Sequence, residues 1–351
     1  MKTGFKKIGV LRANALGDFI LSLPALEALK SSYPDAEVVL LGRTSHLEFL
    51  KNKKAPVDRV IPIPGHIKFD ETLLEEDDEK AHFLRGLREE KFDLLIQLHG
   101  GGRYSNAFIN SIGPVLSVGA STVDAPRLDI NVPYTRFQHE VLRQLEIVEK
   151  VGGKPHGIHP RLSVNEEERK RAGEFLRTLL PHGERRKTVL INPGATDPRR
   201  RWPYLKFAEV CEALLKQGHN ILLNVSPEER PLGEQILKSL GQDKNAFIIS
   251  PSLDELAGVV AHSDLVISND TGTSHLAWAL DIPTVTLFWF VNLISYGPMN
   301  TMKNRVLVSH QCQCPVCDEN YFNMICDHEH SFVSSIPSHD VLKASEELMR
   351  E

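Results

Sequence analysis

The chain has 351 residues, of which 41% are hydrophobic and 25% charged, and its formal net charge at pH 7 is −5. This length and balance are typical of a soluble globular protein with two domains. Neither half carries the excess of Lys and Arg that binding to DNA or RNA requires, so we expect no nucleic acid partner. The longest apolar run, 282–296, is interrupted by Pro283 and Asn292 and is too short to span a membrane.

Short apolar runs that predict buried strands alternate with helical patterns along the chain, which favours parallel sheets covered on both faces. Residues 154–160 predict a linker, and Asn165 with the three glutamates after it predicts the start of a helix. We therefore predict an α/β protein of two Rossmann-like domains, 1–160 and 161–351, which face each other across a cleft. The strand-like runs are 8–11, 38–41, 94–98, 116–118, 189–191, 221–223, 246–249, 265–267 and 284–288.

The first predicted strand, 8–11, leads into a turn that carries an acid. Arg12, Asn14 and Asp18 break the apolar stretch, so we expect no signal peptide and a cytoplasmic location. Asp18 falls at or near the start of the next helix, where aspartate commonly caps the helix end. A helix cap and a catalytic acid are both consistent with this position.

Two turns in the second half of the chain are candidates for binding phosphate. After strand 189–191, a turn with Thr196 leads into the arginines 199–201, which suit a diphosphate, although a solvated basic loop is the alternative. After strand 265–267, the residues 270–272 form a strand-to-helix turn with His275 just beyond it. Backbone N–H groups at a helix start favour phosphate, and Gly272 lets a ligand approach the chain.

Together these motifs resemble glycosyltransferase family 9, the heptosyltransferases of the lipopolysaccharide inner core. The resemblance implies the GT-B fold, with an N-terminal acceptor domain, a C-terminal donor domain and a last helix that can pack back on the N-terminal domain. It implies inverting transfer of a heptose from ADP-heptose, or a related sugar nucleotide, to a lipopolysaccharide core acceptor, without a cofactor or catalytic metal. The motifs are Leu16-Gly17-Asp18, Leu23-Pro24-Ala25-Leu26, Asn192-Pro193-Gly194, Arg200-Arg201-Trp202-Pro203 and Asp270-Thr271-Gly272 with His275.

By this resemblance Asp18 is the general base that takes the proton from the acceptor hydroxyl. Asp270 would contact the donor sugar, and Glu229 or the adjacent Glu228 would bind the ribose. Arg103, in a glycine-rich turn, would meet an acidic acceptor, although a plain flexible turn is the alternative. The full set of donor-binding residues implied is Thr196, Arg200, Arg201, Glu229, Asp270, Thr271, Gly272 and His275. A structural role is the alternative for the glutamates, as first-turn helix acids, and for His275, as a buried histidine at a helix start.

Two further features are a cysteine cluster, of a kind that recurs in this family, and one departure from the family pattern. Cys312, Cys314, Cys317 and Cys326 suggest a structural zinc site, but the spacing is not a standard one and reduced thiols are the preferred interpretation, so no metal ligand is assigned. Trp289 stands where the family usually has glycine after a strand, which bears on the identity of the sugar or nucleotide.

Two other functions stay open at this point. A nucleotide-sugar epimerase of the GT-B type differs from a transferase because a transferase releases ADP only when the acceptor is present. A non-catalytic sugar-nucleotide-binding protein is the third hypothesis. Peripheral contact with the inner face of the inner membrane, the acceptor, the linkage and the oligomeric state are left open by the sequence.

Overall fold

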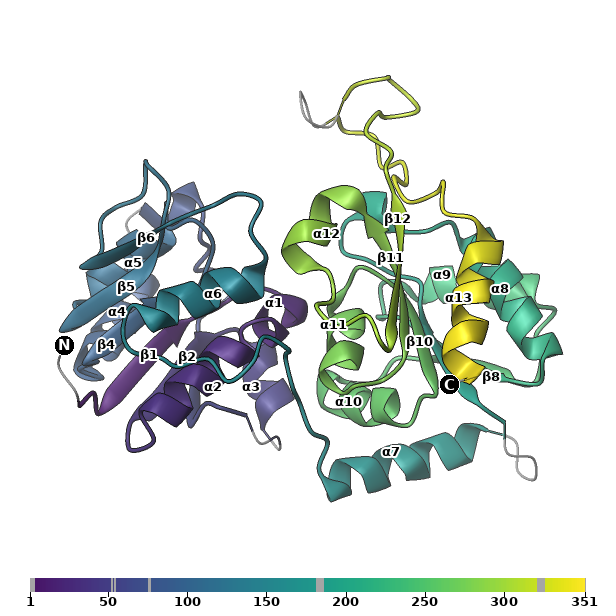
Figure 1. The fold of residues 1–351 in the computed structure, drawn as a ribbon, viewed down its shortest axis with the longest axis horizontal. Helices are drawn as coiled ribbons and strands as arrows, with labels where there is room; N and C mark the ends of the chain where they lie inside the picture. The colour runs from purple at the N-terminus through teal and green to yellow at the C-terminus, as the bar shows by residue number, and fades with distance from the viewer. Residues whose placement is uncertain are drawn as a thin grey trace. The chain divides into compact units, whose positions relative to one another are not determined.

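The computed structural model describes residues 4–51, 53, 55–74, 77–180, 186–320 and 326–350. The chain divides into two compact units, residues 1–160 and 161–351. Each unit contains one six-stranded parallel sheet flanked by helices (Figure 1). The predicted α/β class with two Rossmann-like sheets is thereby confirmed.

The first unit has the strand order β3-β2-β1-β4-β5-β6, and every pair is parallel. Its central strands are almost fully buried because helices cover both faces; α2 packs against α6, and α4 packs against α5. The strands are β1 (Lys7–Leu11), β2 (Glu37–Gly42), β3 (Arg59–Pro62), β4 (Leu94–Gln97), β5 (Leu116–Ser121) and β6 (Ile130–Pro133). The helices are α1 (Leu16–Ile20), α2 (Leu23–Ser32), α3 (Thr44–Leu50), η1 (Glu71–Leu74), α4 (Asp78–Glu89), α5 (Ser105–Ile112) and α6 (Glu140–Glu149).

The second unit has the strand order β12-β11-β10-β7-β8-β9, again with parallel pairs. The last helix, α13, packs against α8 within this unit, and α10 packs against α7. The strands are β7 (Thr188–Asn192), β8 (Asn220–Asn224), β9 (Ala246–Ile249), β10 (Leu265–Asn269), β11 (Thr284–Trp289) and β12 (Asn304–Ser309). The helices are α7 (Glu166–Leu179), η2 (Pro198–Arg200), α8 (Tyr204–Lys216), α9 (Arg230–Ser239), α10 (Leu253–Ala261), α11 (Gly272–Ala279), α12 (Phe290–Tyr296) and α13 (Ser338–Arg350).

The start of α7 shows how local sequence sets an element's boundary. The side chain of Asn165 accepts a hydrogen bond from the backbone N–H of Glu168 at 2.8 Å, and Glu168 accepts one from the backbone N–H of Asn165 at 2.9 Å. This reciprocal pair satisfies two N–H groups that a helix start leaves free. The helix start predicted from the glutamate-rich sequence is therefore confirmed.

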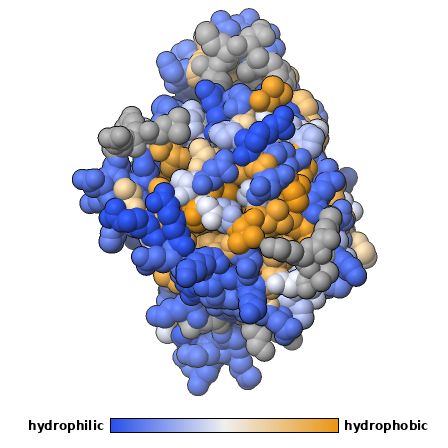
Figure 2. Space-filling model, turned by 90° about the vertical axis from the view of Figure 1, so that its left-hand side faces the viewer, coloured by the Kyte–Doolittle hydropathy of each residue, from blue (hydrophilic) through white to orange (hydrophobic). Residues whose placement is uncertain are grey.

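The surface of the first unit is mixed in character. In the view of Figure 2, hydrophobic residues gather over the middle and hydrophilic residues surround them. Among the residues that the structure describes, no helix combines the length and the apolar character needed to cross a membrane.

Candidate active site

A buried amide network joins the strand ends of the second unit. Asn192 ends β7, and its Nδ2 atom donates to Thr271 Oγ1 at 3.4 Å while its Oδ1 atom accepts from Thr273 Oγ1 at 3.0 Å. Asn224, which ends β8, donates to the same Oδ1 atom at 2.8 Å. Asn269, which ends β10, donates to a backbone carbonyl in the β7 turn at 2.8 Å. The turns after β7 and β10 are thus fixed to each other at the carboxyl ends of the strands, where open α/β sheets bind ligands.

Asp270 lies at the centre of this edge and is 4% exposed. Its Oδ2 atom accepts hydrogen bonds from Arg200 Nη1 at 3.2 Å and from Asn292 Nδ2 at 2.8 Å, and its Oδ1 atom lies 3.6 Å from His275 Nε2. Burial raises the pKa of Asp270, but His275, Arg200 and Asn292 together outweigh burial and lower it. The carboxylate is therefore ionised, and protein groups already face both of its oxygens.

The helix that follows Asp270 begins with a side-chain cap. Ser274 Oγ accepts from the backbone N–H of Thr271 at 3.4 Å and donates to the carbonyl of Thr271 at 2.7 Å. His275 is 5% exposed and contacts the edge of Trp278, with ring centroids 4.5 Å apart. Its Nδ1 atom is buried and has no hydrogen-bond partner among the described residues. Thus His275 faces Asp270 through Nε2 and adjoins Gly272 at the start of α11.

The three consecutive arginines have different partners. Arg199 pairs with Asp197 at 2.8 Å, and Arg201 Nε donates to the carbonyl of Ala195 at 2.8 Å. Arg200 alone of the three bonds to Asp270, and its side chain is 26% exposed. Its guanidinium group is therefore held in place and still reachable by a ligand. Thr196 is exposed in the same turn.

The structure separates the two adjacent glutamates. Glu228 is exposed, whereas Glu229 is half-buried and its carboxylate lies over Gly194 in the β7 turn. A Cβ atom at Gly194 would come within 2.1 Å of Glu229 Oε1, so this carboxylate packs directly against the backbone of the β7 turn. Of the two acids, Glu229 is the one at the candidate donor edge.

The acid of the first unit rests on a buried arginine. Arg12, which is 2% exposed, donates from Nη2 to Asp18 Oδ1 at 3.1 Å and to Glu140 Oε2 at 3.3 Å. It also donates from Nε to the backbone carbonyl of Asp18 at 3.1 Å. Asp18 is the third residue of α1, whose N-cap is Ala15, and its side chain is 25% exposed. Arg12 therefore fixes the position of Asp18 and leaves its carboxylate accessible.

A cavity of about 570 Å³ lies next to this turn, at the carboxyl ends of β1 to β3. Arg43 and Lys68 line it, and Arg43 Nε donates to the carbonyl of Ala13 at 2.7 Å. His99 also lines it and accepts from the backbone N–H of Ala13 at 3.2 Å. Burial, with a smaller contribution from Arg12 and Arg43, lowers the pKa of His99 to about 3, so this imidazole is neutral at pH 7. Asp70 also lines the cavity, but the two cations outnumber this single acid, so the cavity suits a ligand that carries anionic groups.

Sequence reasoning missed three members of these clusters. Arg43 and Lys68 follow the ends of β2 and β3, and Asn292 follows the end of β11. The signal for Arg43 was a polar residue directly after an apolar run. Arg103, which the resemblance favours, is 67% exposed, lies 3.5 Å from Asp124 and is outside the lining of the cavity.

Trp289 points into the core of the second unit. It is 2% exposed, stacks on Phe332 with centroids 4.6 Å apart, and donates from Nε1 to the carbonyl of Gln311 at 2.9 Å. Trp289 therefore packs in the core of the second unit and anchors the segment that follows β12.

Sequence comparisons identify curated relatives of this chain. Lipooligosaccharide heptosyltransferase 2 from Haemophilus influenzae is 23% identical over 295 residues, which are 78% of this chain and 80% of the relative. Lipopolysaccharide heptosyltransferase 3 from Escherichia coli is 22% identical over 362 residues, covering 95% and 96% of the two chains.

Solved structures share the fold. A glycosyl transferase family 9 protein from Veillonella parvula DSM 2008 superposes with a TM-score of 0.79 at 21% identity, covering 100% of this chain and 99% of its own. The E. coli ADP-heptose LPS heptosyltransferase II superposes with a TM-score of 0.77 at 21% identity and covers 98% of each chain. The fold is therefore GT-B. The family model described as glycosyltransferase family 9 (heptosyltransferase) matches residues 81–324, and since this is most of the chain, the protein belongs to that family and is a glycosyltransferase.

Proposed function

We propose that this enzyme transfers a heptose from ADP-heptose to a lipopolysaccharide core acceptor with inversion at the anomeric carbon. The names of the relatives support these substrates, because several are lipopolysaccharide or lipooligosaccharide heptosyltransferases, and the alignments cover most of their length. The observation that carries the mechanism is the pairing of Arg200 with the buried Asp270 at the edge of the second sheet. It supplies a positioned cation where a diphosphate leaving group would gain charge.

In the donor half, the bond between the anomeric carbon and the diphosphate oxygen breaks, and ADP leaves with the bonding electrons. Arg200 stabilises the developing negative charge, together with backbone N–H groups at the start of α11. Asp270 and Asn292 act mainly as positioning residues, since the oxygens of Asp270 already face Arg200, Asn292 and His275. Glu229 is placed at the β7 turn to accept hydrogen bonds from the ribose hydroxyls.

In the acceptor half, a hydroxyl oxygen of the acceptor attacks the anomeric carbon on the face opposite the leaving diphosphate. Asp18 removes the hydroxyl proton as the new bond forms, which is the task of a general base in an inverting transfer. Arg12 holds the carboxylate in place. Arg43 and Lys68 bind the anionic groups of the acceptor in the adjacent cavity. Because Arg200 supplies the positive charge, this scheme requires no catalytic metal.

The test is an assay of ADP release from ADP-heptose with and without a purified lipopolysaccharide core acceptor. The proposal predicts that ADP appears only with acceptor, and that NMR of the product shows the inverted anomeric configuration. An epimerase would instead convert the sugar nucleotide without acceptor. Binding of ADP-heptose with no turnover on any core acceptor would contradict the proposal.

A further inference from the structure

The chain between β12 and α13 forms a loop that projects from the second unit and returns to it (Figure 1). Both ends of the loop are attached to the core. Trp289 donates to the carbonyl of Gln311 near the exit, and the backbone N–H of Phe332 donates to the carbonyl of Arg199 at 2.8 Å at the return. Between these anchors lie four of the five cysteines of the chain.

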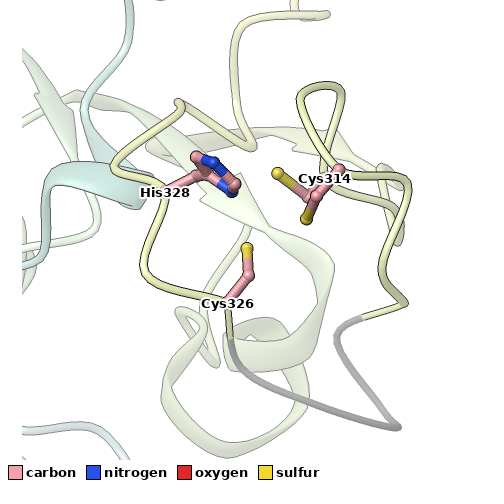
Figure 3. A group of neighbouring side chains, drawn as sticks. Cys314, Cys326 and His328 are labelled. Carbon is pink, nitrogen blue, oxygen red and sulfur yellow. The ribbon is translucent and has the colours of Figure 1, made fainter.

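Four side chains in this loop converge. The sulfur atoms of Cys314, Cys317 and Cys326 and one ring nitrogen of His328 all lie within 4.8 Å of one another. Figure 3 shows Cys314, Cys326 and His328 pointing toward a common centre. Cys312 is outside the group, and its Sγ atom instead donates to the carbonyl of His310 at 3.3 Å. The structure therefore replaces the four-cysteine set suggested by the sequence with three cysteines and a histidine.

A tight turn presents the first two sulfur atoms together. The backbone N–H of Asp318 donates to the carbonyl of Cys314 at 2.8 Å, and the N–H of Cys314 donates to the carbonyl of Glu319 at 2.9 Å. Residues Gln313 and Asn320 form an antiparallel bridge across the base of the turn. Asp318 has a φ of 64°, a left-handed conformation that closes the turn. These bonds hold Cys314 and Cys317 in one hairpin.

We propose that Cys314, Cys317, Cys326 and His328 bind one structural zinc ion. Three thiolates and an imidazole form a closed tetrahedral set, which is a common structural zinc site and leaves no open position for substrate or water. With Zn–S bonds of about 2.3 Å, sulfur atoms in such a tetrahedron lie about 3.8 Å apart, so the observed group needs only small movements to close on an ion. Soft thiolate ligands disfavour Mg²⁺ and Ca²⁺.

The metal would join two parts of the loop that are distant in sequence. Cys314 and Cys317 lie in the hairpin of the outgoing part of the loop, whereas Cys326 and His328 lie in the part that returns to the second unit. The returning part of the loop then reaches Phe332, whose backbone N–H donates to the carbonyl of Arg199, next to Arg200. Zinc therefore stabilises the segment that supports the arginine turn, without touching the reacting atoms.

The first experiment measures metal content in the full-length protein. Inductively coupled plasma mass spectrometry should find one zinc ion per chain in the purified wild type. Cys326→Ser and His328→Ala should each reduce the zinc content at least tenfold, whereas the matched control Cys312→Ser should keep it. Wild-type protein with less than a tenth of an equivalent of zinc, after growth and purification with zinc supplied, would overturn the proposal. Equal loss in Cys312→Ser would overturn the ligand set, and iron in place of zinc would overturn the choice of metal.

A second measurement does not depend on how the variants fold. X-ray absorption at the zinc edge of the wild-type protein should show three sulfur ligands at about 2.3 Å and one nitrogen at about 2.0 Å. A shell of oxygen and nitrogen ligands alone would mean adventitious zinc and would contradict the proposal. Both readouts are independent of turnover, so they stand even if the proposed substrates are wrong.

Discussion

The two candidate acids, Asp18 and Asp270, lie at the carboxyl ends of the strands of their sheets and have different surroundings. Asp18 in the first unit is 25% exposed and pairs with Arg12. Asp270 in the second unit is 4% exposed and faces Arg200, Asn292 and His275. A carboxylate that must take up a proton has to be reachable, whereas a carboxylate that positions a cation is best shielded and fully paired. The difference supports proton transfer at Asp18 and charge stabilisation around Asp270.

The largest effect on turnover is expected from removing the exposed carboxylate of Asp18. Asp18→Asn preserves shape but removes the proton acceptor, so turnover in the ADP-release assay should fall by roughly 10²–10⁴-fold. The control is Asp35→Asn, a change at an exposed aspartate of the same unit, which should keep wild-type turnover. Near wild-type turnover in Asp18→Asn would show that another group is the base.

Breaking the pair formed by Arg200 and the buried Asp270 should weaken binding of the diphosphate. Arg200→Ala should weaken ADP binding by about 1.5–3 kcal/mol and leave adenosine binding almost unchanged, because a charge-assisted hydrogen bond to phosphate is lost. Isothermal titration of both ligands measures this, with Arg177→Ala as a control at an exposed position on α7. An equal loss for ADP and adenosine would point to misfolding or to a contact with the nucleoside.

The first unit should also carry a pH dependence of stability. His46 is fully buried, and burial, followed by the charges of Arg43 and Arg12, lowers its pKa to about 4. Since the unfolded state binds the proton more readily, the contribution of this histidine to stability is complete above pH 6.5 and is lost as the pH falls toward 4. At pH 5 the contribution of His46 to the free energy of unfolding is lower by about 2 kcal/mol than at pH 7.

Denaturant unfolding at several pH values between 7 and 5 checks this expectation. His46→Asn keeps an acceptor for the backbone N–H of Arg43, which bonds to His46 Nδ1 at 3.2 Å in the wild type. The variant should lose less stability over this range, whereas His82→Asn, at an exposed position, should follow the wild type. A slope in His46→Asn that equals the wild-type slope would contradict the assignment.

The smallest effect is expected for the acceptor cavity. Lys68→Ala should raise KM for the acceptor about threefold and leave KM for ADP-heptose unchanged, because an exposed lysine contributes less than about 1 kcal/mol to an ion pair. Arg103→Ala provides the comparison between the cavity and the exposed glycine-rich turn. A larger effect on the acceptor from Arg103 than from Lys68 would place the acceptor at that turn.

The central strands were predictable from the sequence, whereas three of the four edge strands were not; the exception is β9. Every strand predicted from an apolar run is present, whereas β3, β6 and β12 were missed. All three lie at the edge of a sheet, where one side has no neighbouring strand and burial is only partial. Their sequences mix polar residues with apolar ones, and β3 and β6 each end in proline, so an apolar-run criterion cannot detect them.

The site shows the same limit. Asp270 stands directly after strand β10, and Asp18 and Arg200 lie in the short helices that follow β1 and β7, so all three could be found from the sequence. Asn292 could not, because its role depends on the pairing of β10 with β11, which brings it to Asp270. His328 was missed for a similar reason, since the cysteine spacing alone does not show that a histidine completes the group.

The most direct test of these separate roles is to measure the affinity for ADP of two variants, Asp18→Asn and Arg200→Ala, side by side. The account predicts that Asp18→Asn binds ADP as tightly as the wild type although it has lost turnover, whereas Arg200→Ala binds ADP at least tenfold more weakly. If Asp18→Asn lost ADP affinity to the same degree as Arg200→Ala, the separate roles of the two carboxylates and their arginines would be wrong.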